Sequence, residues 1–338
     1  MAVTALGNSD VSYARNLDTR SGSLTGPASA PKEAEVEQGT DQPMYDAQPP
    51  TDGTDPMDNI GQETGQQSEQ QANQQSDSQS DPFDQTISVA YPEMDGDMQL
   101  RIAMGPGRLK ITPMADGETG WVTGSYRDPS KSIPVRIQTE GTKTRISQHV
   151  DSVRIPRPRG VPVLELRLGA GRSYTLTIDG GANEIDAELG GLPLNKLECR
   201  FGAGQAVFRF GAPNPGQMDR LSFSTGASEM TARDLANAGA AEISVDGGVA
   251  AIHLDFGGTL VRDCRARVNA GAASIDITVP SSGAARIATH SVLAGVDIGD
   301  GFQTKEGAFW TPAAIAGQTP LLSIDATIAL AGLKVRAE

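Results

Sequence analysis

Three groups of residues in this 338-residue sequence are of types that could take part in chemistry. The first is FGAGQAVFRFG at 201–211, where a Gly-x-Gly lies in an apolar run, with similar tripeptides at Gly169–Gly171 and Gly105–Gly107. Glycine-rich loops of this kind can cradle phosphate groups. A Walker A loop also needs a Gly-Lys-Ser/Thr, and a dinucleotide fingerprint needs a third glycine, and FGAGQAVFRFG has neither. We therefore expect no nucleotide site and no bound cofactor.

The second stretch carries three alternating carboxylates, Glu184, Asp186 and Glu188. Glycosidases use two carboxylates about 5–10 Å apart, and neighbouring outward residues of one strand fall in that range. Polysaccharide clefts are usually lined with aromatic residues, whereas this chain has two Trp and five Tyr, and both Trp121 and Trp310 lie outside the regular repeats described below. We expect a protein that is not an enzyme, with a carbohydrate-active β-helix enzyme as the alternative.

The third set consists of His253, Asp276 and the two cysteines. The repeat described below places His253 beside Asp276 on an outer face, where a surface cross-strand pair is expected rather than half of a catalytic triad. Cys199 and Cys264 have no Cys-x-x-Cys spacing and lie in strand-like stretches, which indicates buried thiols. The sequence thus predicts no catalytic, cofactor-binding or metal-binding residue.

Charge is concentrated in the first part of the chain. Residues 1–86 hold 15 acidic and 3 basic residues, so that only −2 of the net charge of −14 belongs to 87–338. Because the segment is rich in Gln, Ser and Asp and lacks apolar periodicity, we expect a disordered acidic tail that serves as a tether. The near-neutral remainder gives little support to nucleic-acid binding, and its densest basic stretch, Arg154 to Arg159, is short and interrupted by proline.

The sequence contains no apolar run of 18 residues and no basic start followed by an apolar core. It therefore predicts neither a transmembrane helix nor a signal peptide, and no direct insertion into a membrane. Either the protein is cytoplasmic, or an exporting or anchoring segment is missing from this chain.

Residues 87–338 are rich in glycine and in alternating apolar residues, which is typical of an all-β protein. A glycine followed four residues later by an apolar residue recurs at separations of 21, 24, 22 and 23 residues. The five glycines are Gly181, Gly202, Gly226, Gly248 and Gly271.

Apolar residues occupy the same places around each of these glycines: three and five residues before it, and four, six and eight after it. Leu176, Ile178, Ile185, Ala187 and Leu189 are the set around Gly181, and Gly105 obeys the same rule. The Gly226 copy carries Asp234 at the eighth place and Leu235 one place later, which suggests a β-bulge.

Each unit is therefore a strand, a glycine turn and a second strand in about 22 residues. Such units bury a continuous core only when they are stacked, with neighbouring strands about 4.8 Å apart. The constant length favours a single-stranded β-solenoid (β-helix) over an antiparallel meander. The glycines are expected at sharp corners, where they supply positive φ and avoid a Cβ clash.

Stacking also predicts which outward charges meet. The residues seven places after the glycines place Glu188 opposite Arg209, and Arg233 opposite Asp255. Opposite charges across neighbouring strands stabilise modestly and help to define the register.

The stretch MQLRIAMGPGRLKITPMADGETGWVTGSY resembles the N-terminal toastrack module of bacterial envelope-stress proteins. The following repeats, down to ATIALAGLKVR, resemble the C-terminal β-helical domain of LiaF-like and PspC-associated proteins, a family that also includes adhesin-like proteins. The resemblance covers about residues 95–338 and rests on glycine and apolar spacing. It implies a non-enzymatic interaction module that binds a protein or cell-envelope partner, coupled to envelope-stress signalling, and a location at the membrane or envelope. A surface adhesin is the alternative to this signalling role.

We therefore divide the chain into an acidic tail (1–86), a toastrack-like module (87–160) and a solenoid with a C-terminal cap (161–338). The segment from Ser281 to Thr319 interrupts the period, and we expect it to cover the C-terminal end, with Phe302, Phe309 and Trp310 as packing residues. An incompletely capped edge would allow self-association. The alternative role of the three aromatic residues is an exposed partner patch.

Overall fold

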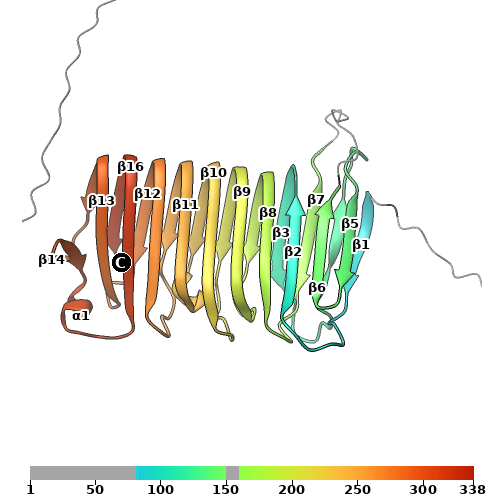
Figure 1. Ribbon diagram of the computed structural model, residues 1–338, viewed down its shortest axis with the longest axis horizontal. Helices are drawn as coiled ribbons and strands as arrows, with labels where there is room; N and C mark the ends of the chain where they lie inside the picture. The colour runs from blue at the N-terminus through green and yellow to red at the C-terminus, as the bar shows by residue number, and fades with distance from the viewer. Residues whose placement is uncertain (1–80, 82, 150–159) are drawn as a thin grey trace, which may run out of the picture. The chain divides into compact units, whose positions relative to one another are not determined.

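The computed structural model describes residues 81, 83–149 and 160–338 (Figure 1). The chain divides into two units, 1–73 and 74–338, and every described residue belongs to the second. The predicted disordered tail therefore lies almost wholly outside the described residues, as does the basic stretch Arg154 to Arg159. Within the described part, no helix is both long enough and apolar enough to cross a membrane.

Seven long strands form a parallel stack, and neighbours pair residue by residue. This pairing confirms the β-solenoid and rules out an antiparallel meander for this part of the chain. In the order of the stack, the strands are β8 (Tyr174–Glu188), β9 (Leu194–Arg209), β10 (Met218–Arg233), β11 (Ala240–Asp255), β12 (Cys264–Val279), β16 (Leu321–Ala337) and β13 (Ala284–Ile298).

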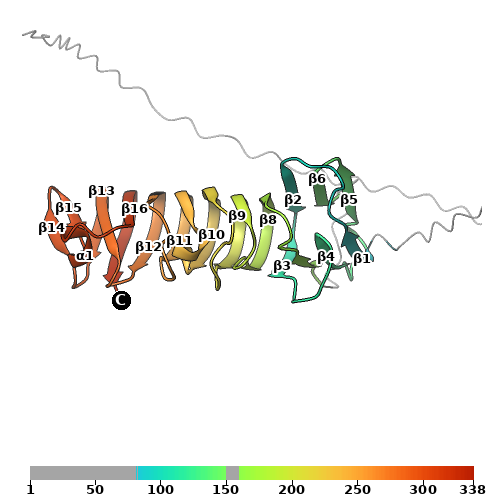
Figure 2. The ribbon, with the colours of Figure 1, turned by 90° about the horizontal axis from the view of Figure 1, so that it is seen from below.

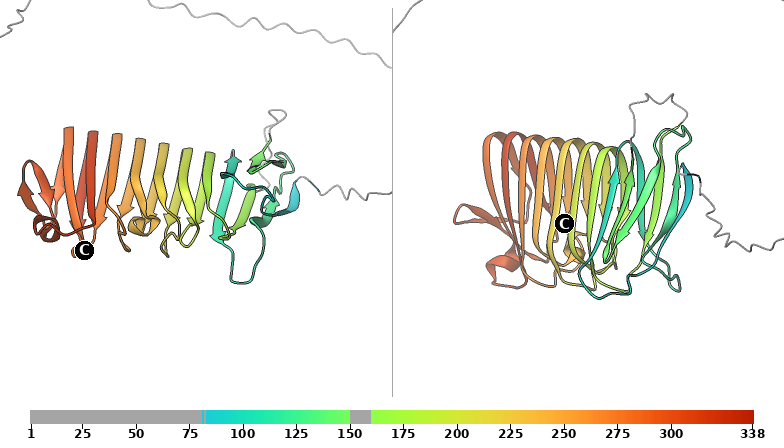
Figure 3. Two further views of the ribbon diagram at one scale, coloured as in Figure 1. Left: turned by 60° about the horizontal axis from the view of Figure 1, so that its bottom comes forward. Right: turned by 45° about the vertical axis from the view of Figure 1, so that its right-hand side comes forward.

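Each long strand is one coil of the solenoid and bends near its middle, so that its two halves face each other across a core (Figure 3, right). In β8, Leu176 and Ile178 before the bend and Ile185 and Ala187 after it are all at most 2% exposed. The alternation therefore changes phase at the bend, as the spacing around the glycines predicts. Apolar side chains from both halves meet inside and form one continuous core along the stack.

The glycines at the bends are required by close packing between coils. A Cβ atom at Gly226 would lie 2.5 Å from the carbonyl oxygen of Gly202, and one at Gly248 would lie 2.9 Å from that of Gly226. None of the five repeat glycines has a positive φ. The expectation of positive φ at these corners was therefore wrong, whereas the expected need for clearance is confirmed.

The end of the β10 coil differs from the prediction of a β-bulge. The strand ends at Arg233, and Asp234 follows in the left-handed region with a φ of 57°. A short 3₁₀ turn, η1 (Leu235–Ala238), then directs Leu235 into the core, where it is 1% exposed. The displaced apolar residue is therefore explained by a turn after the strand, and a bulge within the strand is not present in this coil.

The N-terminal strands extend the two halves of the solenoid separately. The half after the bend continues from β8 through β3 and β7 to β4 and β1, and the half before it continues through β2 and β6 to β5. The pairs β1–β4, β4–β7 and β5–β6 are antiparallel. The strands are β1 (Asp84–Val89), β2 (Met98–Met104), β3 (Gly107–Pro113), β4 (Val122–Arg127), β5 (Val135–Glu140), β6 (Lys143–Gln148) and β7 (Val163–Leu168).

The predicted boundary at 160 between a toastrack-like module and the solenoid stays a prediction. One sheet runs through this point, because β7, which follows it, pairs with both β3 and β4. Leu100, Ile102, Leu109 and Ile111, the apolar set around Gly105, are all at most 2% exposed. β2 and β3, which are joined by the bend at Gly105 and pair with opposite halves of β8, therefore have the same inward pattern as the two halves of a coil.

The C-terminal strand does not lie at the end of the stack. β16 is inserted between β12 and β13, in parallel register with both, so β13 is the terminal coil (Figure 1). β14 (Gln303–Lys305), β15 (Ala308–Trp310) and α1 (Pro312–Ile315) lie beyond β13, where β15 pairs with Arg286 and Ile287 (Figure 2). The prediction that Ser281 to Thr319 interrupts the period was therefore wrong for its first part, which forms the coil β13, whereas the part after β13 does cover one half of this end.

The three aromatic residues expected in this cap are partly buried. Phe302 and Phe309 pack against the main core, and Trp310 packs against a small cluster of alanines that includes Ala284. The Arg286 guanidinium lies 5.8 Å from the centre of the Trp310 ring. These contacts support the packing role over the exposed partner patch.

Candidate functional site

The carboxylates that resembled a glycosidase pair are each engaged separately on the outer face of β8. Glu184 accepts a hydrogen bond from Arg108 Nε at 2.7 Å, and Asp186 forms an ion pair with Arg209 from the next coil. These groups are exposed and each faces its own cation. The arrangement is that of inter-coil ion pairs, which stabilise register modestly.

Glu188 has a different partner from the one predicted. The register does place it beside Arg209, but its carboxylate accepts hydrogen bonds from two turn glycine N–H groups, each at 2.9 Å. Asp255 binds the N–H of Gly257 in the same way, at 2.8 Å. Burial raises the pKa of Asp234, and the nearby carboxylates of Asp255 and Glu188 raise it further. Glu188 and Asp255 thus hold the turns at the coil ends through backbone N–H groups.

His253 lies beside Asp276, as predicted, with 3.2 Å between Nδ1 and Oδ2. Both side chains are well exposed, at 45% and 35%, which agrees with a surface cross-strand pair. Cys199 and Cys264 are buried and unpaired as thiols, and burial raises the pKa of both, that of Cys264 to about 12. Among the described residues, no group of three or more His, Cys, Asp or Glu could hold a metal ion.

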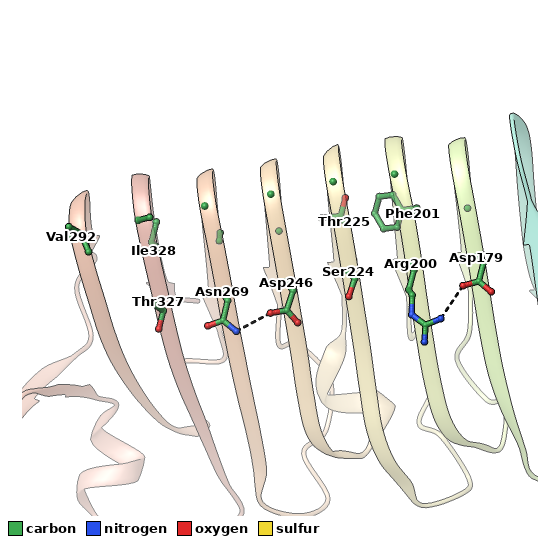
Figure 4. A pocket seen from close by; sticks show the side chains of 18 residues that line it. Asp179, Arg200, Phe201, Ser224, Thr225, Asp246, Asn269, Val292, Thr327 and Ile328 are labelled. Carbon is green, nitrogen blue, oxygen red and sulfur yellow. Dashed lines mark hydrogen bonds and ion pairs between the residues drawn. The ribbon is translucent and has the colours of Figure 1, made fainter.

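A concave surface follows the bends of the stacked coils from β8 to β13 (Figure 4). This bend groove has a volume of about 720 Å³ and is open along its length. Its floor consists of the glycine column and of small residues such as Ala270 and Ala329. A row of polar side chains, two residues before each repeat glycine or its equivalent, follows one side: Asp179, Arg200, Ser224, Asp246, Asn269 and Thr327.

The polar row is charged at its β8 end. Asp179 accepts hydrogen bonds from Arg101 Nε at 2.7 Å and from Arg200 Nη1 at 3.2 Å. Arg200 also donates to Glu198 at 2.7 Å, and the ammonium group of Lys196, hydrogen-bonded to Glu198, lowers the pKa of that carboxyl. The side chain of Arg200 remains 53% exposed. This end therefore presents a positioned guanidinium beside the glycine floor.

The row becomes neutral to acidic toward β12. Asn269 donates to Asp246 at 3.0 Å, and Ser244 donates to the other oxygen of the same carboxylate at 3.1 Å. Ser224 and Thr327 contribute hydroxyl groups on either side (Figure 4). Because the donors and acceptors recur once per coil, at about 4.8 Å, they suit a ligand that runs along the stack.

This row was not predicted from the sequence, although the spacing around the glycines contains its signal. The outward columns considered above lie five and seven residues after each glycine, where His253 and Arg209 are found. The column two residues before each glycine is polar in all five repeats. Such a column in an otherwise alanine-rich and glycine-rich bend indicates an exposed polar edge.

No family model matches this sequence, and no curated protein matches it. Solved structures with a similar arrangement include a putative cell adhesion protein from Clostridium sporogenes, with 13% identity and a TM-score of 0.40 over 75% of this chain and 99% of the other. Two others each cover 75% of this chain and 96% of their own. They are a putative adhesin from Bacteroides fragilis (9% identity, TM-score 0.34) and a putative lipid binding protein from Parabacteroides distasonis (14%, 0.36).

Proposed function

We propose that this protein is a non-enzymatic interaction module that binds a protein or cell-envelope partner along its bend groove. The observation that carries the proposal is the polar row from Asp179 to Thr327 beside a glycine floor. A groove with a narrow floor and regularly spaced polar groups favours an extended partner that contacts several coils at once. Each contact is weak, so affinity would depend on their number.

From the resemblance to toastrack and LiaF-like domains, we also propose that the module has a role in envelope-stress signalling. The groove would then bind an envelope component or a signalling protein. A pull-down of envelope fractions with the full chain, followed by mass spectrometry and glycan analysis, distinguishes the two classes of partner. If neither class of partner is recovered above the level found with an unrelated solenoid protein, the signalling role is contradicted.

The groove is tested by replacing exposed charged residues inside it and, as a control, one outside it. We expect Arg200→Ala and Asp246→Ala to weaken binding of the recovered partner by at least about tenfold, which corresponds to about 1.4 kcal/mol. Arg220→Ala is the control, because Arg220 is also an exposed arginine in a 3.0 Å ion pair, with Glu242, but does not line the groove. Equal loss in all three variants would place the binding surface elsewhere.

The proposal assigns no catalytic role to Glu184, Asp186 and Glu188. Their separate partners, Arg108, Arg209 and turn amides, support this assignment. The test is turnover of a broad panel of polysaccharides by the full chain. Turnover that is lost in Asp186→Asn would overturn the non-enzymatic role and favour a carbohydrate-active enzyme.

A further inference from the structure

The terminal coil β13 is covered over only one of its halves. Its first half pairs with β15 at Arg286 and Ile287, and Ile287 is fully buried. Its second half, from 292 to 298, pairs with β16 on one side. Within the described part of the chain, no strand pairs with the other side of residues 292–298. We refer to this side as the open edge.

At the open edge, inward-facing residues of the core are incompletely covered. Val296 occupies an inward-facing place and is 37% exposed, and Ile298, two residues on, is only partly buried. At the place of Val296, the residues of the six other coils are at most 2% exposed: Ile185, Ala206, Met230, Ile252, Ile275 and Leu333. The difference arises because β13 has a neighbouring coil on one side only.

Apolar residues also surround the open edge at the bend. Val292 and Leu293 are 80% and 75% exposed, and Leu330, beside Leu293 on β16, is 52% exposed. The equivalent places in β8 and β9 hold glycine and alanine. The small residues at the bends of these early coils are thus replaced by larger aliphatic residues at the terminal coil. Exposed apolar side chains beside unpaired strand groups are the usual features of a strand-pairing surface.

We infer that the open edge binds a second copy of this chain, by antiparallel pairing of residues 292–298 about a twofold axis at Gly295. An unpaired strand edge is satisfied by another strand, and the exposed inward residues require that strand to bring apolar side chains at alternate positions. Residues 292–298 of a second copy meet both requirements.

The choice of a twofold pair over a growing fibre follows from the cap. β15 and α1 occupy the end of the first half of β13, so a complete coil cannot be added there. A twofold antiparallel pair uses the second half alone and closes after two copies. In this register Asp297, the single charged residue of the segment, lies opposite Leu293, so the two copies bring no like charges directly opposite each other.

A cysteine at the proposed axis tests the pairing directly. In Gly295→Cys the two introduced thiols would face each other, since directly opposite antiparallel residues lie about 4.5–5.5 Å apart between Cα atoms. This is within the disulfide range of about 4.4–6.8 Å. A Cβ at Gly295 meets nothing within 4 Å, and the native Cys199 and Cys264 are buried. We expect mild oxidation to give a disulfide-linked dimer.

Gly332→Cys is the matched control. Gly332 lies beside Gly295 on β16, and a Cβ there also meets nothing within 4 Å. In the twofold pair the two copies of residue 332 would be separated by three strand spacings, about 14 Å, which is beyond disulfide reach. Equal cross-linking of both variants, or none in Gly295→Cys, would overturn the inference.

Sedimentation of the full chain over a range of concentrations provides an independent readout. We expect a monomer–dimer equilibrium that Val296→Lys shifts toward monomer by at least about tenfold in Kd, or about 1.4 kcal/mol. Val249→Lys, at an exposed valine (66%) of an interior coil, should leave it unchanged. A protein that stays monomeric at all concentrations would contradict the inference. The inference would also be contradicted if another part of the same chain protects the amides of the open edge from hydrogen exchange in that monomer.

Discussion

The interior coils and the terminal coil β13 share one sequence pattern but differ in their surroundings. Ile252 in β11 has a coil on each side and is completely buried, whereas Val296, at the same place in β13, is 37% exposed. The inward pattern therefore does not itself create a buried core. In a repeat protein, burial is a property of the interface between neighbouring units.

The order of strands decides which coil has the free side. Since β16 is inserted between β12 and β13, both edges of this last strand are paired. The C-terminal residue itself is held there, with the Glu338 N–H donating to the Val279 carbonyl at 3.0 Å. The open edge thus belongs to β13, a strand about 40 residues from the C-terminus.

Truncation of inward side chains should show the largest difference between the two regions. We expect Ile252→Ala to lower the free energy of unfolding by about 3 kcal/mol, because it removes apolar contacts and leaves a cavity between two packed coils. Val296→Ala should cost less than about 1 kcal/mol, since its site is already partly open. Urea unfolding at low protein concentration measures both. Equal costs would contradict the difference in burial.

Adding a methyl group at the bends should give the next largest difference. Gly226→Ala places a Cβ 2.5 Å from a backbone oxygen of the neighbouring coil, and we expect a loss of about 2 kcal/mol. Gly295→Ala meets nothing within 4 Å and should be neutral, or stabilise by up to about 1 kcal/mol through the unfolded chain. Thermal unfolding of the two variants compares them directly.

The buried carboxylate of Asp128, which follows β4, allows a similar test in the N-terminal part of the sheet. Asp128 is 2% exposed, and its carboxylate accepts hydrogen bonds from Ser130, Ser132 and Ile133. Burial acts to raise the pKa of Asp128, but these hydrogen bonds outweigh it and hold the pKa below its ordinary value of 3.8. We expect Asp128→Asn to cost about 2 kcal/mol at pH 7, because charge-assisted bonds are lost.

The pH dependence of this loss has a defined sign. A lowered pKa in the folded state means that the ionised carboxylate stabilises the protein at pH values above 3.8, and that this contribution disappears as the pH falls through the lowered pKa. The difference in unfolding free energy between wild type and Asp128→Asn should therefore shrink from pH 7 to pH 2. The exposed Asp246→Asn is the control, and a difference that stays constant for Asp128→Asn would show that its charge is not involved.

The sequence allowed the coil to be predicted because its unit is local. The spacing of apolar residues around each repeat glycine is a property of about 20 consecutive residues, and all of the predicted inward residues around Gly181 are buried. The close contact that requires glycine at the bends could not be predicted from a single unit. The clash at Gly226 involves Gly202, which is distant in sequence and adjacent only after stacking.

The order of the last strands and the choice of ion-pair partners were not predictable from the repeat. β16 and β13 have the same pattern, so periodicity cannot tell which of them pairs with β12. Similarly, a long arginine side chain can reach either of two carboxylates on a neighbouring strand, and Arg209 binds Asp186 and not Glu188. Both outcomes depend on three-dimensional packing beyond the single unit.

The insertion of β16 between β12 and β13 determines which edge of the stack is open. Two double-cysteine variants test it most directly. Ser274 of β12 lies beside Gly332 of β16, and Gly332 lies beside Gly295 of β13. Ser274→Cys with Gly332→Cys joins adjacent strands about 4.8 Å apart, whereas Ser274→Cys with Gly295→Cys spans about 10 Å, beyond disulfide reach. We expect an intramolecular disulfide in the first variant only, measured by mass spectrometry of the monomer. A disulfide between 274 and 295 would show that β13 pairs directly with β12 and would contradict the insertion of β16.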